Sequence, residues 1–374
     1  MHNFNFVHPQ KLSFGEKSLQ TFVEEFGKFP AQKPLIVLSD RALHQPDIDK
    51  FLKQISSHNI DFEISTNVTP EAPEELVAEI ASDYKSNNCD GIIAIGGGST
   101  IDLAKAATII ISNGGKIQDY YGLDTFEKQI VPKIFIPTTS GTGSESSNII
   151  VLSNKEQKYK KGIVSNNLFA DWVILDPELT HTMPEELTLA TGLDAFSQSI
   201  EAYTSRNANP LVDLYAIQSM KLIRKNLEGA MNNEKGAREN MSLAAYLSGI
   251  VISGGNAGTN LAHAIGNTIG AIYHTPHGTT VTSVLKEVLE FNSKEEGIKE
   301  KITKLRGELG EEVLRFIESI DAKFNIPSLS ILGIKETELE DIADKILNTQ
   351  QRLLANNLKE VNKSDLIGIM QRSM

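Results

Sequence analysis

The sequence contains one cysteine, Cys89, in 374 residues. A single thiol can form no disulfide within the chain, and it cannot build a cysteine-held zinc finger or thiolate cluster. Basic side chains are also outnumbered, since 36 Lys and Arg stand against 48 Asp and Glu, for a net charge of −12. A dedicated nucleic-acid-binding protein needs a basic surface. The composition therefore argues against nucleic acid as a partner.

Long apolar runs are missing as well. No stretch approaches the ~18–20 apolar residues that a membrane-spanning helix requires, and the opening segment MHNFNFVHPQ lacks the basic-then-apolar pattern of a secretory signal. Hydrophobic residues make up 40% of the chain and charged residues 22%, which is the balance of a folded globular protein. We expect a soluble cytoplasmic protein with no membrane partner, and a chain of this length favours two domains.

The first half of the chain alternates short apolar runs with helical patterns. The runs predict strands at 33–40, 61–68, 91–95 and 133–137, and the patterns predict helices at 47–57, 73–87 and 99–111. This alternation is typical of a parallel sheet with helices on both faces. We therefore predict an α/β domain over residues 1–180.

The second half has the pattern of helices almost throughout. Pro177 and Pro184 punctuate the segment DPELTHTMPEE, where we place the domain boundary. We predict an all-helical domain over residues 181–374. Its helical patterns lie at 184–204, 209–231, 235–252, 260–271, 279–291, 296–322 with a break near Gly310, 336–356 and 364–372.

Two glycine-rich segments follow predicted strands. The first, GGGST at 96–100, opens a helical pattern whose first turn includes Asp102. Glycines let the backbone approach a ligand closely, and a helix N-terminus attracts phosphate. The spacing differs from the GxGxxG fingerprint, so the segment predicts a phosphate site without the usual Rossmann motif. The alternative is a tight turn that binds nothing.

The second segment, PTTSGTGSES at 137–146, supplies several hydroxyl groups. Because ligands of open α/β sheets lie at the carboxyl ends of the strands, two such segments favour a bound nucleotide over a flexible surface loop. Asp40 ends the predicted strand at 33–40, where a carboxylate can accept hydrogen bonds from an adenosine ribose and would repel a 2′-phosphate. This favours NAD over NADP, although an Asp after a strand also starts turns.

A candidate metal site lies in the second half. Of eight histidines, only His263, His274 and His277 cluster in the sequence, and Asp194 and Gln198 in LDAFSQSIE are four residues apart on one helix face. Carboxylate and imidazole groups are good ligands for Zn²⁺ or Fe²⁺, whereas an amide carbonyl is a weaker, neutral ligand. The alternatives are a solvated helix face and histidines that are buried in the core.

Five ordered segments make the sequence resemble the iron-containing (group III) alcohol dehydrogenase family over essentially its whole length. They are DGIIAIGGGSTIDLAKA (90–106), IPTTSGTGSE (136–145), DPELTHTMPEELTLATGLDAFSQSIEAYTSRNANPL (176–211), NLAHAIGNTIGAIYHTPHG (260–278) and VLEFN (288–292). The resemblance implies a dehydroquinate synthase-like fold, with an N-terminal nucleotide-binding parallel-sheet domain and a C-terminal all-helical metal and substrate domain. It also implies a metal-dependent, NAD(P)-linked alcohol dehydrogenase or aldehyde reductase that acts on small substrates and forms a homo-oligomer.

The resemblance assigns roles to two sets of residues. The cofactor-binding set is Asp40, Gly96, Gly97, Gly98, Ser99, Asp102, Thr138, Thr139, Thr142 and Lys160, with Lys161 as the alternative to Lys160. The metal-binding set, for Fe²⁺ or Zn²⁺, is Asp194, Gln198, His263 and His277.

Three positions depart from the family pattern. Gln198 stands where members usually carry His, Asn267 where they often carry His, and Glu71 where they carry Asn on the nucleotide side. An amide in place of an imidazole should weaken metal binding. Asn267 cannot carry a proton near neutral pH as His can, which leaves water, His274 or the cofactor ribose as the proton route.

Three other functions stay open at this stage. Maleylacetate reductases are relatives that need no metal, which the change at Gln198 would allow. Dehydroquinate synthases share the two-domain plan and are lyases, but a phosphorylated substrate calls for Lys and Arg near the site, and the segments around the metal set contain none before Arg206. The third is an NAD-binding protein that has lost catalysis. Cys89 has no recognisable base partner, so we expect no thiol nucleophile.

Overall fold

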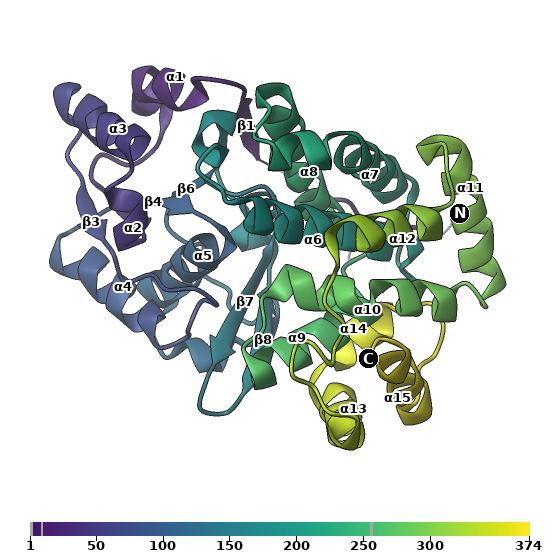
Figure 1. The fold of residues 1–374 in the computed structure, drawn as a ribbon. Helices are drawn as coiled ribbons and strands as arrows, with labels where there is room; N and C mark the ends of the chain where they lie inside the picture. The colour runs from purple at the N-terminus through teal and green to yellow at the C-terminus, as the bar shows by residue number, and fades with distance from the viewer. Residues whose placement is uncertain (1–2, 9, 255–256) are drawn as a thin grey trace. The chain divides into compact units, whose positions relative to one another are not determined.

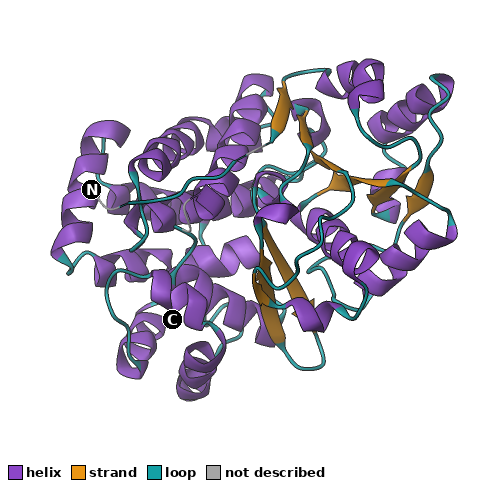
Figure 2. Cartoon of the chain, turned by 180° about the vertical axis from the view of Figure 1, so that it is seen from behind, coloured by secondary structure: helices purple, strands orange, loops and turns teal. Residues whose placement is uncertain are grey.

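The computed structural model describes residues 3–8, 10–254 and 257–374, and they form two compact units. The sheet unit is His8–Met183, and the helical unit is residues 3–7 together with Pro184–Met374. The predicted fold class, a parallel-sheet domain followed by an all-helical domain, is confirmed (Figures 1 and 2). The units divide three residues beyond the predicted boundary, and residues 3–7 join the helical unit.

The sheet unit is built on a six-stranded sheet in which every described pairing is parallel. Its order is β1-β9-β6-β4-β2-β3. The strands are β1 (Lys11–Phe14), β2 (Pro34–Leu38), β3 (Glu63–Ser65), β4 (Gly91–Gly96), β6 (Lys133–Pro137) and β9 (Trp172–Leu175). Every residue of β2, β4 and β6 is buried, as expected of strands that are covered on both faces.

Helices cover both faces of this sheet (Figure 1). Phe22 of α1 and Phe51 of α3 pack in one core with Ile36 and Ile93, whereas Lys105 of α5 faces Phe135 on the opposite side of the sheet. The helices of the unit are α1 (Ser18–Glu25), α2 (Asp40–Leu43), α3 (Pro46–Ser57), α4 (Leu76–Ser86) and α5 (Gly98–Asn113). Short 3-10 turns are η1 (Phe26–Lys28), η2 (Ile117–Tyr120), η3 (Ser144–Ser146), η4 (Asn166–Leu168) and η5 (Pro177–Thr180).

A second, three-stranded sheet was not predicted. It has the order β5-β8-β7 and consists of β5 (Gly122–Leu123), β7 (Ile149–Asn154) and β8 (Tyr159–Val164). β7 and β8 form an antiparallel hairpin that pairs Ile149 with Val164 and Asn154 with Tyr159. The sequence of β8, YKKGIV, has too little apolar character to stand out as a strand.

The helical unit contains the predicted series of helices. They are α6 (Glu185–Thr204), α7 (Pro210–Met231), α8 (Lys235–Ser253), α9 (Leu261–Tyr273), α10 (His277–Asn292), α11 (Glu296–Leu309), α12 (Val313–Phe324), α13 (Leu339–Thr349), α14 (Gln351–Asn356) and α15 (Lys363–Arg372), with η7 (Glu336–Glu338) before α13. The predicted break near Gly310 is the end of α11, where this glycine has a φ of 80°.

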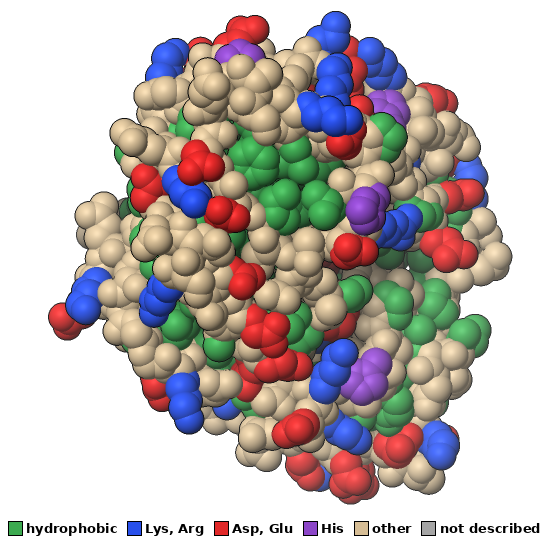
Figure 3. All heavy atoms as spheres, turned by 90° about the vertical axis from the view of Figure 1, so that its left-hand side faces the viewer, with side chains coloured by type: hydrophobic (Ala, Val, Ile, Leu, Met, Phe, Trp, Pro, Cys, Tyr) green, Lys and Arg blue, Asp and Glu red, His purple; other side chains and the backbone are tan. Residues whose placement is uncertain are grey.

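α6 is the central helix of this unit and packs against α7, α8 and α10. Every residue from Gly192 to Thr204 is buried, so Asp194 and Gln198 do not lie on a solvated face. None of the described helices combines the length and the apolar character needed to cross a membrane. On the face seen in Figure 3, acidic and basic side chains are interspersed, as expected of a protein with a modest acidic excess.

Candidate metal centre and nucleotide loops

Three side chains of the helical unit meet at one point. Asp194 of α6, His263 of α9 and His277 of α10 each present a ligand atom within 4.8 Å of the others. The Oδ1 atom of Asp194 lies 3.4 Å from Nε2 of His263 and 3.5 Å from Nε2 of His277. Asp194 and His263 are buried, whereas the His277 side chain is 29% exposed, so the cluster is open on one side.

A glycine allows α10 to approach α6 closely enough for this meeting. A Cβ atom on Gly278 would lie 2.2 Å from the carbonyl oxygen of Ala190 and 3.2 Å from Cβ of Asp194. Only a residue without a side chain fits there, because the first contact is far below van der Waals distance. Pro276 precedes His277, the first residue of α10, and fixes the backbone that leads into the helix. The sequence PHG thus places His277 against Asp194.

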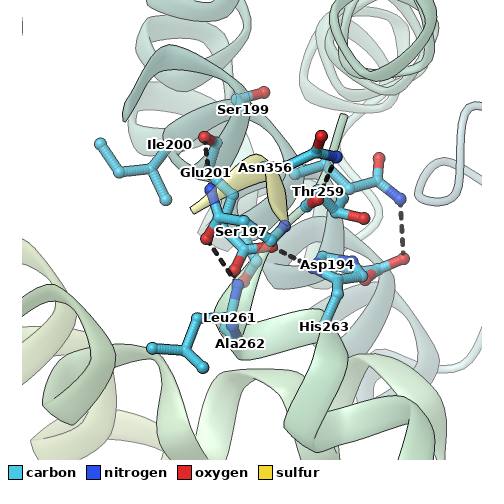
Figure 4. A network of polar contacts seen from close by, with 12 residues as sticks. Asp194, Ser197, Ser199, Ile200, Glu201, Thr259, Leu261, Ala262, His263 and Asn356 are labelled. Atoms are coloured by element: carbon cyan, nitrogen blue, oxygen red, sulfur yellow. Dashed lines mark hydrogen bonds and ion pairs between the residues drawn. The ribbon is translucent and has the colours of Figure 1, made fainter. Parts of the chain in front are cut away.

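The carboxylate of Glu201 holds His263 in place (Figure 4). Its Oε2 atom lies 2.6 Å from Nδ1 of His263 and accepts the backbone N–H of Asn260 at 3.1 Å, while its Oε1 atom accepts the N–H of Ala262 at 2.6 Å. Glu201 is 1% exposed. Because a carboxylate can only accept, Nδ1 of His263 carries a proton, so Nε2 is the nitrogen that would bind a cation.

The electrostatics of the cluster suit a cation. Burial lowers the pKa of His263, but the carboxylates of Glu201 and Asp194 outweigh burial and raise that pKa to about 9. Its Nε2 atom is buried and has no hydrogen-bond partner among the described residues. One carboxylate and two imidazoles are a suitable donor set for a divalent transition metal, so the residues present fit such an ion.

Gln198 lies one turn after Asp194 on α6 and is 4% exposed. Its Nε2 atom donates to Oδ2 of Asp194 at 3.3 Å, and its Oε1 atom accepts from the hydroxyl of Ser248 on α8 at 2.9 Å. The structure therefore brings Gln198 to the cluster, with its amide nitrogen towards the carboxylate.

His274, the candidate for proton relay, ends α9 with a φ of 56° and is exposed.

The two glycine-rich segments of the sheet unit pack against each other. A Cβ atom on Gly97 would lie 3.2 Å from the side chain of Thr139, and one on Gly98 would lie 2.7 Å from Oγ1 of Thr142. Gly96 ends β4, and its carbonyl oxygen accepts the N–H of Thr138 at 3.0 Å. The glycines therefore let the loop after β6 lie on the N-terminus of α5. Ser99 follows in the first turn of that helix, where backbone N–H groups have no partner within the helix and can bind an anion such as phosphate.

Asp102 and Lys105 of α5 hold the second glycine-rich segment, residues 137–146, through hydrogen bonds. Asp102 accepts hydrogen bonds from the hydroxyl of Ser144 and from the N–H of Val151. Lys105 is fully buried and donates to the carbonyl oxygens of Ser144 at 2.6 Å and Ser147 at 2.8 Å. Burial raises the pKa of Asp102 and lowers that of Lys105 to about 8. The sequence did not single out Lys105, because its partners lie 39 and 42 residues away.

Asp40 lies at the same edge of the sheet as the glycine-rich loops. It begins α2 directly after β2, and its side chain is 81% exposed. The chain passes from β2 outward to β3 and then returns to β4 on the other side of β2. The carboxyl ends of β2 and β4 thus border a switch point of the sheet, which is where open α/β sheets bind their ligands.

Lys160 lies on the buried side of β8 and forms an ion pair with Glu71. Its side chain is 8% exposed, whereas the neighbouring Lys161 points to the other side, with Nζ 4.5 Å from the ring centroid of Tyr159. Glu71 has a φ of 72°. The loop that carries Glu71 is fixed to the same hairpin, since Glu74 accepts the hydroxyl of Tyr159. The sequence showed Glu71 only as a departure from the family pattern.

Cys89 is buried beside β4, and burial raises the pKa of its thiol to about 11. Such a thiol is almost entirely protonated at neutral pH and is a poor nucleophile. We therefore assign no nucleophilic role to Cys89.

Family models match both parts of the chain. A model of the iron-containing alcohol dehydrogenases matches residues 9–177, and one for the C-terminal part of the Fe-containing alcohol dehydrogenase family matches residues 188–374. The NAD-dependent methanol dehydrogenase of Bacillus methanolicus is 34% identical over 354 residues, which cover 91% of this chain and 92% of that protein. These matches favour the alcohol dehydrogenase prediction over the lyase and metal-independent alternatives.

Solved structures show the same fold over the whole chain. A crystal structure of 1,3-propanediol oxidoreductase superimposes with a TM-score of 0.94 at 28% identity and covers 100% of both chains. Sulfoacetaldehyde reductase from Bifidobacterium kashiwanohense, solved in complex with NAD⁺, has a TM-score of 0.87 at 25% identity and covers 100% of this chain and 99% of its own. The chain therefore belongs to the iron-containing alcohol dehydrogenase family and is an oxidoreductase that acts on CH–OH groups.

Proposed function

We propose that the protein interconverts small alcohols and their aldehydes with NAD as the hydride carrier and with Fe²⁺ held by Asp194, His263 and His277. The observation that carries this proposal is the convergence of the three ligand atoms within 4.8 Å of one another, in a cluster where Nε2 of His263 is buried and has no hydrogen-bond partner among the described residues. Two imidazoles and one carboxylate are the set that non-haem Fe²⁺ sites use.

The residues around the metal position have separate tasks. Glu201 fixes the ring and the proton of His263, so that Nε2 is the nitrogen that faces the cluster. His277, the more exposed ligand, lies on the open side, where a small substrate can enter. A divalent metal bound there supplies a Lewis acid that lowers the pKa of an alcohol and polarises a carbonyl. Asn267 lies one turn after His263 and cannot take up the alcohol proton near neutral pH, so the proton leaves by another group or by water.

The nucleotide loops support NAD as the cofactor. The N-terminus of α5 and the backbone of Gly97 and Gly98 form a site for the pyrophosphate, and Thr138, Thr139 and Thr142 line the nicotinamide side. Asp40 is exposed after β2, where its charge favours a free ribose and disfavours the 2′-phosphate of NADP. Lys160 is the proposed contact to the second ribose. These groups orient the nicotinamide for hydride transfer.

Small alcohols are the proposed substrates because relatives act on them. The names of several similar proteins specify methanol, 1,3-propanediol and sulfoacetaldehyde, all of them short molecules with an oxygen on a terminal carbon. Another similar protein is named for long-chain alcohols. A cytoplasmic location and a homo-oligomer stay predictions.

A panel of short alcohols and aldehydes tests the proposal, run with NAD(H) and NADP(H) and with Fe²⁺, Zn²⁺ or no added metal. We expect turnover with NAD(H) that rises with Fe²⁺ and disappears after chelation. Undiminished turnover in chelated protein of measured zero metal content would instead support a metal-independent reductase. Absence of any turnover over the whole panel would favour a nucleotide-binding protein without catalysis.

A further inference from the structure

The two oxygen atoms of Asp194 have different surroundings. Oδ1 faces Nε2 of His263 at 3.4 Å and Nε2 of His277 at 3.5 Å. Oδ2 instead accepts the amide N–H of Gln198 at 3.3 Å. One oxygen is thus directed to the point where the ligand atoms meet, and the other is held by a neighbouring side chain. Ligating carboxylates are commonly held in this way by a hydrogen bond to their second oxygen.

The other end of the Gln198 amide is also held. Its Oε1 atom accepts the hydroxyl of Ser248 at 2.9 Å, and Ser248 is fully buried on α8. Since Gln198 is 4% exposed, its amide stays between these two groups and not in solvent. An amide that turned by 180° would bring two acceptor oxygens together at Asp194. Ser248 would allow either orientation, because its hydroxyl also lies 2.8 Å from the carbonyl oxygen of Ala245 and can donate its one hydrogen there. The observed hydrogen bonds therefore favour one orientation, with the N–H group towards Asp194.

We propose that Gln198 is a positioning residue for Asp194 and not a metal ligand. This inference rests on the proposed function, because it concerns the metal that Asp194, His263 and His277 would hold. In this chain the protein then supplies three ligands where an imidazole at position 198 would supply a fourth. One more coordination position is left for water or substrate, and the ion is held less tightly.

The consequence is a metal site of distinct selectivity. A third imidazole, as the fourth protein ligand, completes the tetrahedral set that favours Zn²⁺, whereas two imidazoles and one carboxylate with open positions are typical of Fe²⁺. The change from His to Gln at this position would therefore shift preference away from Zn²⁺ without altering the three remaining ligands. Gln198→His should reverse this shift and raise Zn²⁺ affinity about tenfold or more.

Co²⁺ is the probe that tests the inference, since its visible absorption reports the number and kind of ligands independently of activity. We compare the full-length protein with Gln198→Leu, which keeps the bulk but has no polar atom, and with Ser248→Ala. Ser197→Ala is the matched control, because the hydroxyl of Ser197 is bonded to the carbonyl oxygen of Leu193 at 2.7 Å within α6. Thermal unfolding of each variant shows whether it has folded.

We expect Gln198→Leu to leave the Co²⁺ spectrum unchanged. Its affinity for Co²⁺ should fall about tenfold, because the side chain that orients the ligand Asp194 is lost. Ser248→Ala should lower affinity less, and Ser197→Ala should leave it unchanged. A changed band position or intensity in Gln198→Leu overturns the inference alone, because it makes the amide a ligand. Failure of the unaltered protein to bind Co²⁺ or Fe²⁺ overturns the proposed function, and the inference with it.

Discussion

Glu201 and His263 face each other across 2.6 Å in the buried centre of the helical unit, with one carboxylate oxygen against Nδ1 of the ring. The two residues lie 62 positions apart in the sequence. The same carboxylate accepts the backbone N–H groups of Asn260 and Ala262 at the start of α9. One side chain therefore sets both the position of the helix and the nitrogen that His263 presents to a metal.

Replacing Glu201 with Gln should weaken metal binding. The amide oxygen can still accept up to two hydrogen bonds, but the NH₂ group must then face at least one backbone N–H, because all three partners of Glu201 are donors. We expect Fe²⁺ affinity to fall about 10- to 100-fold, as for other groups that orient metal ligands. Equilibrium metal binding measures this, with Glu186→Gln on an exposed position of α6 as the control. Equal affinity in both variants would contradict the role of Glu201.

Gly278→Ala should disrupt the cluster without removing any polar group. The added methyl group would lie 2.2 Å from the carbonyl oxygen of Ala190, so α10 must move away from α6. We expect metal affinity to fall at least tenfold and stability to fall by about 1–3 kcal/mol, as for overpacked sites. Gly307→Ala is the control, because that glycine lies within α11 and a Cβ there would meet nothing within 4 Å. Binding as tight as in the unaltered protein would show that the close approach is not needed.

Lys160→Met should weaken binding of NADH. Loss of a charged hydrogen-bond donor to the ribose removes about 1.5–3 kcal/mol, which corresponds to an affinity loss of roughly tenfold or more. Lys161→Met is the matched control, since that neighbour lies over the ring of Tyr159 on the other side of the strand. Titration of the reduced nicotinamide fluorescence gives both dissociation constants. A larger loss in Lys161→Met would identify Lys161 as the cofactor lysine.

Glu145 predicts a pH dependence of stability in the sheet unit. It is 2% exposed, and burial raises its pKa from 4.5 to about 7. Between these two values the folded state holds a proton on Glu145 that the unfolded chain releases. The stabilising contribution of protonated Glu145 to the free energy of unfolding is therefore fully present below pH 4.5 and is lost as the pH rises to about 7.

Glu145→Gln removes this titration, and its stability relative to the unaltered protein should increase by about 2 kcal/mol between roughly pH 5.5 and 7.5. Urea unfolding followed by fluorescence measures the change, because the only tryptophan, Trp172, is buried in β9 of the same unit. Parallel pH profiles for the two proteins would contradict the assignment to Glu145.

The sequence predicted many of the strands and helices whose own residues show an apolar run or a helical periodicity. The runs that became β2, β4 and β6 are apolar throughout, and the helices of the second half show their periodicity directly. β1 and β8 were missed because their sequences, KLSF and YKKGIV, are partly polar. β7 and β9 were also missed, although their sequences, IIVLSN and WVIL, are largely apolar. β8 is a strand because β7 pairs with it, and a pairing partner is invisible in a propensity pattern.

The same limit applies to the functional residues. Asp194, Gln198, His263 and His277 were predicted from ligand chemistry and family resemblance, and the structure brings them together. Glu201, Ser248 and Lys105 were not assigned roles, since each acts on groups 39 to 62 residues away in the sequence. The sequence also could not show which way the Gln198 amide faces, because that depends on the three-dimensional arrangement of its hydrogen-bond partners Asp194 and Ser248.

Anaerobic titration of Fe²⁺ into the unaltered protein and into His263→Ala tests the central claim most directly, with NADH affinity measured on the same samples. The account predicts one Fe²⁺ per chain in the unaltered protein, none in the variant, and the same NADH affinity in both, because the ligands lie in the helical unit and the nucleotide loops in the sheet unit. Equal Fe²⁺ binding in the two proteins would contradict the assignment of the buried cluster as the metal centre.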